Sequence, residues 1–192
     1  MSFDPNHYNE LTSRKTSIPG LIEFKLPVHG DNRGWFKENF QREKLLTHGL
    51  PEDFEIVQNN ISFNKKKGVT RGIHAEPWEK FISVGFGVVF AAIVDLRPTH
   101  NFGAVEIFEL NPGTAIFVPR GCGNSFQTLE DNTVYTYLVN DHWSPDAEYT
   151  FVNLADPELA IPWPIPLEKA ELSEKDKNHP MLSELKKKYG IA

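Results

Sequence analysis

Short strand-like segments follow one another at fairly regular spacing through the second half of the chain, and this pattern limits the possible folds more than any other feature. Each segment is rich in β-branched and aromatic residues, which favour strands. Turn signals such as Asn111-Pro112-Gly113 and Arg120-Gly121 separate them. Many short strands punctuated in this way indicate an antiparallel sandwich or barrel. The segments span residues 104–110, 114–119, 125–130, 133–139 and 148–154.

The apolar run from Phe81 to Leu96 predicts the rigid centre of this fold. It is rich in Val, Ile and Phe and is interrupted by Gly85 and Gly87, so we expect two buried strands broken by a tight turn or bulge. Other signals are weaker. They predict a loose arm or short helix over 1–17, strands over 21–27, 31–40 and 55–63, an amphipathic helix over 41–51 and a closing helix over 179–190.

Composition argues against several classes of function. A chain of 192 residues with 40% hydrophobic content suffices for one core, so we expect a single domain over 1–192. A formal net charge of −6 argues against nucleic-acid or membrane partners, because those polyanions require a basic face. The lone Cys122 cannot form an intrachain disulfide, and no signal peptide or uncharged 18-residue run occurs. We therefore expect a soluble, cytoplasmic protein.

A stretch near the middle of the chain gathers candidate reactive side chains. Arg71, His74 and Lys80 lie within ten residues of one another. An imidazole titrates near neutral pH and can act as a base. Alternate residues of a strand face opposite sides, so His74 shares a face with both cations only if the chain bends near Pro77 or Trp78. A single histidine equally fits a role in local hydrogen bonding.

The histidine spacing predicts no metal site. No His-x-His pair occurs, and the only nearby combination of ligand types is His74 with Glu76.

Short motifs along the chain form an ordered series from about residue 18 to 185. They are Arg33-Gly34 with Phe36 and Glu38, Gln58 with Asn60, GVTRGIH at 68–74, VDLR at 94–97, FVPRG at 117–121, the tyrosine-bearing segment ending at Pro145, and LSEKD at 172–176. Each is weak alone, but their joint order and spacing resembles the dTDP-4-dehydrorhamnose 3,5-epimerase family. The resemblance implies an all-β fold, a cupin-type β jelly roll with a few short peripheral helices, usually a homodimer. Its core would span 18–155, between the arm at 1–17 and an irregular, helical tail at 156–192.

The same resemblance implies an activity and four catalytic residues. The family epimerises a nucleotide-linked 4-keto-6-deoxyhexose next to its ketone without a cofactor, in deoxysugar biosynthesis for lipopolysaccharide or other glycans. Such a reaction needs a base, a stabiliser of the enolate oxygen and a proton donor. His74 matches the family's base, and Asp176 matches the carboxylate that orients it. Lys80 matches the lysine near the enolate oxygen, and Tyr137 the acid on the opposite face.

Ten further residues match substrate contacts by the same resemblance. Guanidinium forks suit phosphate oxygens, and two amides at i and i+2 of a strand point to one side. The matches are Arg33, Arg71 and Lys175 for the pyrophosphate, Phe36 and Glu38 for the base, Gln58 and Asn60 for sugar or phosphate, Glu148 for a further contact, and Asn124 and Trp143 for the sugar pocket.

Two pocket positions depart from the family pattern. Asn124 stands where a second histidine is usual, Trp143 stands where a tyrosine is usual, and the loop from His74 to Lys80 is shorter than the common form. Asparagine cannot carry a positive charge or relay a proton near pH 7. These changes leave open whether C3, C5 or both are inverted, and whether the nucleotide is dTDP, CDP or UDP.

Three alternatives follow from these departures and from the fold. One is a C3-only epimerase acting on another pyrimidine nucleotide such as CDP. Another is a non-catalytic sugar-nucleotide-binding cupin, although a binder has no need for both a base such as His74 and an acid such as Tyr137. The third is a metal-dependent cupin oxygenase.

Overall fold

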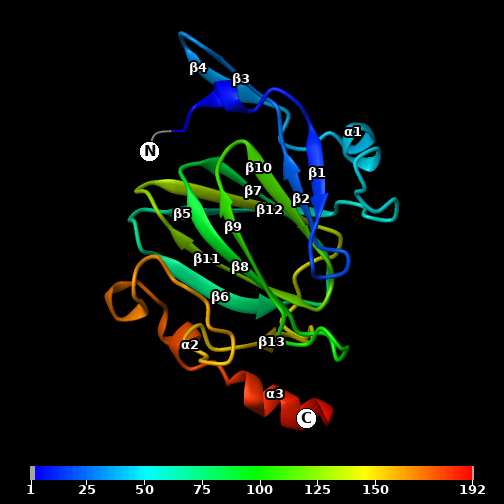
Figure 1. Cartoon of the computed structure of the whole chain (residues 1–192), viewed down its shortest axis with the longest axis vertical. Helices are drawn as coiled ribbons and strands as arrows, with labels where there is room; N and C mark the ends of the chain where they lie inside the picture. The colour runs from blue at the N-terminus through cyan, green and yellow to red at the C-terminus, as the bar shows by residue number, and fades with distance from the viewer. Residues whose placement is uncertain (1–2, 192) are drawn as a thin grey trace.

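Two antiparallel sheets packed face to face form the body of the protein, as the computed structural model of residues 3–191 shows (Figure 1). The six-stranded sheet has the order β1 (Thr12–Lys15), β2 (Ile22–Lys25), β10 (Thr114–Val118), β7 (Lys80–Phe86), β12 (Thr133–Val139) and β5 (Gln58–Asn64). The five-stranded sheet has the order β13 (Thr150–Phe151), β6 (Thr70–Ala75), β11 (Cys122–Thr128), β8 (Val89–Asp95) and β9 (Val105–Leu110). This arrangement is a cupin-like jelly roll, so the predicted fold class is confirmed.

The remaining elements are small and lie outside the two sheets (Figure 1). A two-stranded hairpin, β3 (Val28–Asp31) and β4 (Gly34–Lys37), projects at the N-terminal end. The helices are α1 (Arg42–Leu46), α2 (Glu174–Lys177) and α3 (Leu182–Tyr189), with 3-10 turns at Pro5–His7 and Leu167–Lys169. Among residues 3–191, no helix has both the length and the apolar character needed to cross a membrane.

Three apolar clusters explain why the central strands lack an alternating pattern. One cluster lies between the sheets and includes Ile82 and Ile93. A second covers the outer face of the six-stranded sheet with residues from α1 and the loop after it, and a third covers the outer face of the five-stranded sheet with the C-terminal tail. Strands β7 and β8 are therefore buried on both faces, which requires continuous apolar runs. The two strands expected between Phe81 and Leu96 are confirmed, and they belong to different sheets.

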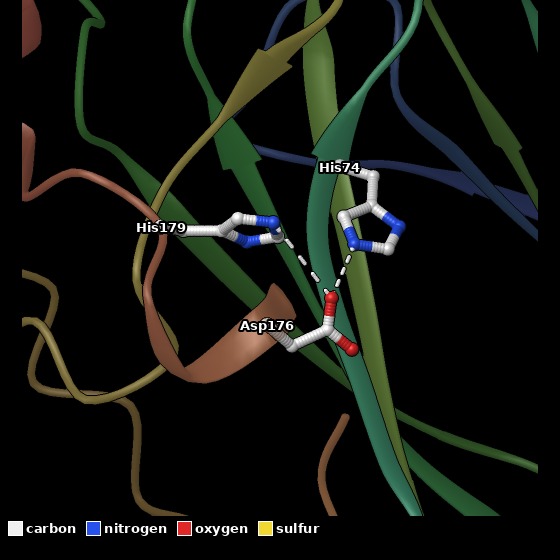
Figure 2. A group of neighbouring side chains, drawn as sticks. All are labelled: His74, Asp176 and His179. Carbon is white, nitrogen blue, oxygen red and sulfur yellow. Dashed lines mark hydrogen bonds and ion pairs between the residues drawn. The ribbon is translucent and has the colours of Figure 1, made fainter. Parts of the chain in front are cut away.

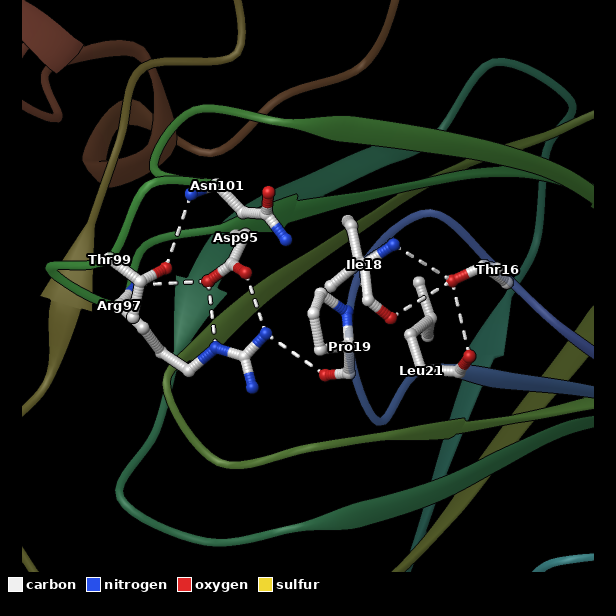
Figure 3. Close-up of polar contacts among 8 residues, drawn as sticks. All are labelled: Thr16, Ile18, Pro19, Leu21, Asp95, Arg97, Thr99 and Asn101. Carbon is white, nitrogen blue, oxygen red and sulfur yellow. Dashed lines mark hydrogen bonds and ion pairs between the residues drawn. The ribbon is translucent and has the colours of Figure 1, made fainter.

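A buried ion pair fixes the turn that precedes β2 (Figure 3). Asp95 is fully buried at the end of β8, and Arg97 holds both its oxygens, at 2.8 Å from Nε and 2.6 Å from Nη2. The same guanidinium donates to the carbonyl of Pro19 at 3.0 Å. Because both charges are paired and hydrogen-bonded, burial of the carboxylate is tolerated. The contact joins the end of β8 in the five-stranded sheet to the turn before β2 in the six-stranded sheet.

A bulge in β6 sets the directions of the candidate reactive side chains. His74 pairs with Asn124 of β11, whereas Arg71 pairs with Phe126, so three steps on β6 face two on β11. Gly72 lies inside the bulge with φ of +130°, and a Cβ there would overlap Ser125. The extra residue turns Arg71 and His74 toward the same side, which corrects the expectation of a regular strand that bends only near Pro77 or Trp78.

The structure also differs from the expected elements at the chain's ends. Residues 12–15, expected in a loose arm or short helix, form the edge strand β1, whose four side chains are all exposed. Residues 1 and 2 of that arm, and residue 192 of the expected tail, lie outside the described residues. The strand expected over 148–154 shortens to two residues, and the LSEKD motif forms α2.

We predict that Gly72→Ala destabilises the protein by about 2 kcal/mol or more, because it adds a steric overlap with Ser125 to the cost of a positive φ. Gly34→Ala is the matched control, since Gly34 has φ of +138° but open space around its Cβ position. Urea unfolding measures both variants. Equal losses of unfolding free energy in the two variants would contradict this prediction, because they would show that the backbone of the bulge moves to avoid Ser125.

Candidate active site

A cavity of about 500 Å³ lies between the two sheets and gathers polar side chains from both. Arg71, His74 and Asn124 reach it from the five-stranded sheet, and Lys80 and Tyr137 from the six-stranded sheet. Titratable groups therefore face each other across one space, which suits proton transfer to and from a bound ligand. The other lining residues are Ile61, Ser62, Phe63, Glu76, Phe126 and Tyr135.

His74 is oriented by Asp176 (Figure 2). Its Nε2 donates to Asp176 Oδ1 at 2.8 Å, and Ser173 caps the short helix that carries the carboxylate. Burial favours a higher pKa for Asp176, but the hydrogen bond from His74, the charge of His74 and the hydrogen bond from Ser173 together hold that pKa below its usual range. Because Nε2 carries the proton, Nδ1 keeps a free lone pair and points away from Asp176. His74 is thus equipped to act as a base.

Lys80 is almost completely buried and surrounded by acceptors. Its ammonium contacts a carboxylate oxygen of Glu76 and the side-chain oxygen of Asn124, and it lies 3.4 Å from the carbonyl of His74. Burial lowers the pKa of Lys80 to about 7. The Glu76 carboxylate in contact with the ammonium supplies a negative charge, which favours the protonated form. The contact gives Asn124 a defined role. Its amide oxygen accepts a hydrogen bond from the ammonium, whereas a protonated histidine at this position could not.

Tyr137 stands on the wall formed by the other sheet. Burial raises the pKa of its phenol, although Arg71 acts in the opposite direction. The hydroxyl therefore stays protonated at neutral pH and can donate a proton. Tyr137 and His74 come from facing sheets, so a ligand between them meets a base on one side and an acid on the other.

Three of the residues matched to nucleotide binding lie on or beside the β3–β4 hairpin, outside this cavity. Arg33 and Phe36 line a separate cavity of about 230 Å³. Arg33 pairs with Asp31 at 2.5 Å, and Glu38 pairs with Lys44 at 2.5 Å. All three side chains are exposed and so are available to a ligand or to another chain.

Five further residues matched to substrate contacts do not line the cavity: Gln58, Asn60, Trp143, Glu148 and Lys175. Gln58 and Asn60 point to the same side of β5, as expected, and bond to each other at 2.8 Å. The backbone of the exposed Trp143 donates to Gln58 at 3.3 Å, and Glu148 is exposed in the loop before β13. Lys175 lies on α2, with its ammonium 4.9 Å from the ring centre of Phe151.

Two side chains at the site were not assigned a role from the sequence. Glu76 was considered only as a metal ligand, and His179 was not singled out. His179 is buried beside Asp176, and burial together with His74 lowers its pKa. Asp176 lies on α2 and His179 follows the C-cap of that helix, so the Asp-x-x-His spacing was the available signal. His74, Asp176 and His179 each place one metal-ligand atom within 4.8 Å of the others, a combination that spacing along the chain did not indicate.

Comparisons with known proteins identify the family of this chain. The family model for dTDP-4-dehydrorhamnose 3,5-epimerase matches residues 15–184. The Protein RmlC homolog of Streptococcus pyogenes serotype M6 is 54% identical over 175 residues, 88% of each chain. The dTDP-4-dehydrorhamnose 3,5-epimerase of Pseudomonas aeruginosa is 33% identical over 174 residues, 87% of this chain and 93% of that one. The structure of RmlC from Streptococcus suis in complex with dTDP-D-xylose superposes with a TM-score of 0.88 at 51% identity, covering 92% of this chain and 93% of that one. The chain therefore belongs to the dTDP-4-dehydrorhamnose 3,5-epimerase family.

Proposed function

We propose that this epimerase acts through His74 as the base and Tyr137 as the proton donor, on a nucleotide-linked 4-keto-6-deoxyhexose bound between them. The observation that carries the proposal is the placement of an imidazole with a free Nδ1 and a protonated phenol on facing walls of one cavity. Inversion at carbon requires removal of a proton from one face and its return to the other.

In the first step, His74 Nδ1 takes the proton from a carbon next to the C4 ketone, and the C–H electron pair moves toward the ketone oxygen. The resulting enolate oxygen is stabilised by the ammonium of Lys80, which exchanges one of its protein acceptors for the substrate. Asp176 stabilises the imidazolium. In the second step, Tyr137 protonates the same carbon from the opposite face. His74 then loses its extra proton to solvent, and Tyr137 regains a proton from solvent.

The nucleotide diphosphate is assigned to Arg71 in the cavity and to basic and aromatic residues outside it. Arg71 is proposed to contact the pyrophosphate from within the cavity, with Arg33 and Lys175 farther out. Phe36 is proposed to stack on the base, and Glu38 to accept from its ring. A carboxylate accepts from a thymine, uracil or cytosine equally well, so dTDP is favoured by the relatives' names and not by Glu38.

The cytoplasmic location stays a prediction.

A homodimer is also proposed, on the basis of the apolar edge beside the cavity. Strand β5 lies at the edge of the six-stranded sheet, and its Ile61 and Phe63 side chains are 69% and 59% exposed at the cavity. An open edge with exposed apolar side chains is normally covered by another chain.

We expect wild-type protein to sediment as a dimer and Ile61→Glu to shift toward monomer, because a charge at a buried interface is costly. Ile107→Glu is the control, since Ile107 is an exposed side chain on the other sheet's edge strand, β9. A monomeric wild type, or equal effects of the two variants, would contradict the assigned interface.

The proposed reaction predicts uptake of solvent deuterium into the sugar. With dTDP-linked 4-keto-6-deoxyglucose in heavy water, label should enter at C3, C5 or both, and the carbon positions distinguish full from C3-only epimerisation. His74→Asn should lower the exchange rate by about 10²-fold or more and leave nucleotide affinity nearly unchanged. His100→Asn, at an exposed position, is the control. Nucleotide-sugar binding by wild-type protein without any exchange would favour a non-catalytic binder.

Asp176→Asn tests the role of the carboxylate charge. The amide oxygen can still accept from His74, but it cannot stabilise the imidazolium, so we expect kcat to fall by about 10²-fold or more with KM little changed. Glu174→Gln removes a charge from an exposed carboxylate of the same helix and should have little effect. Equal rates in both variants would show that Asp176 is only structural.

A further inference from the structure

His179 is a buried histidine that the proposed reaction does not use. Only 8% of its surface is exposed, and neither ring nitrogen makes a hydrogen bond of good geometry among residues 3–191, although the Gly72 backbone lies close enough to oppose the lowering of its pKa. Its ring stacks on Phe151 with a centroid distance of 4.7 Å and an interplanar angle of 20°. Its Nε2 is directed at Asp176 Oδ1 from 3.8 Å (Figure 2). Buried polar atoms without partners are rare and call for a ligand or another explanation.

The atoms around His179 have the chemistry and approximate spacing of a metal site. Two imidazole nitrogens and one carboxylate oxygen are ligands that zinc commonly takes. Atoms bound to zinc at about 2.0–2.1 Å in a tetrahedron lie roughly 3.3 Å apart. In the protein, Asp176 Oδ1 lies 2.8 Å from Nε2 of His74 and 3.8 Å from Nε2 of His179. No two of the three ligand atoms are more than 4.8 Å apart. These values bracket the tetrahedral spacing, so small side-chain movements complete the site.

We propose that His74, Asp176 and His179 bind a divalent transition-metal ion such as Zn²⁺, and that the bound ion switches off the catalytic base. The binding claim stands on the three side chains alone, whereas the inhibition rests on the function proposed above. Three protein ligands leave one position for water.

Inhibition follows from the two nitrogens of His74. In the metal-free protein Nε2 carries the proton and donates to Asp176, which leaves the Nδ1 lone pair free. A metal ion on Nε2 displaces that proton, and the neutral ring then holds its proton on Nδ1. No lone pair remains for the substrate, although the imidazole stays in place. The substrate can still bind, so the ion should lower kcat more than it raises KM.

An approach for the ion exists apart from the substrate cavity. Asp176 lines another cavity of about 230 Å³, distinct from the one lined by Arg33 and Phe36, together with Thr70 and Ser173. His74 does not line that cavity, whereas it does line the larger one. The proposed site thus lies between the two spaces.

Calorimetric titration of tag-free, chelator-treated protein with zinc chloride tests the binding claim. Wild-type protein should take up one ion per chain. His179→Gln should weaken binding by at least about tenfold, because one of three ligands is lost. His179→Phe keeps the ring against Phe151 and should weaken binding similarly, which guards against misfolding of the first variant. His100→Gln, at an exposed position, should bind as wild type does. Undiminished binding by both folded His179 variants would overturn the site.

Solvent deuterium exchange tests the switch. Zinc should abolish exchange by wild-type protein, and a chelator should restore it. The zinc concentration for half-inhibition should rise at least about tenfold in the His179 variants. Full exchange by zinc-loaded wild type would overturn the inhibition. Absence of exchange in metal-free wild type that still binds zinc through His179 would refute the proposed function and leave the metal site standing.

Discussion

The hydrogen bond between His74 and Asp176 joins two parts of the chain that are 102 residues apart, and the proposed chemistry depends on it. The carboxylate sits on a four-residue helix, which is too short to be stable alone. Its position is set by the C-terminal tail, whose Leu182 and Leu185 pack against Ile73 and Val94 of the five-stranded sheet. Burial of each such side chain contributes roughly 1.5–3 kcal/mol. An apolar contact on the outer face of the sheet therefore orients an imidazole that lines the cavity on its other side.

The separation between the proposed base and the proposed acid is fixed by sheet packing and not by loops. His74 belongs to one sheet and Tyr137 to the other, and Phe126 stacks on Tyr135 beside them with ring centres 4.1 Å apart. These aromatic rings belong to the same apolar cluster that holds the sheets together. A close-packed interior changes shape little, so the cavity walls are held in place before a ligand arrives. The bulge at Gly72 departs from regular strand geometry, and it turns the imidazole toward the cavity.

Much of the fold could be predicted from the sequence, because its strongest signals come from buried strands. Residues 133–139 form β12 as expected, since the segment consists entirely of Val, Tyr, Leu and Thr and follows clear turn residues. Residues 12–15 gave no such signal, because all four side chains of β1 are exposed and only pairing with β2 makes them a strand. The bulge depends on one glycine with a positive φ, which composition cannot reveal. For the site, His74 and Lys80 stood out by proximity, whereas Asp176 was found only through the family resemblance.

The surroundings of Lys80 show how the departures from the family pattern fit together. An ammonium that is 2% exposed would tend to lose its proton, as its pKa of about 7 after burial indicates. Glu76 supplies a compensating negative charge and Asn124 supplies a neutral acceptor, both in direct contact with Lys80. A histidine at position 124 could do this only as a neutral ring, and its protonation would place a second cation beside the first. Asparagine removes that conflict, so the ammonium keeps its charge and its orientation over a wider range of pH. In the proposed reaction, the enolate oxygen meets a donor that is already desolvated, and little reorganisation is needed.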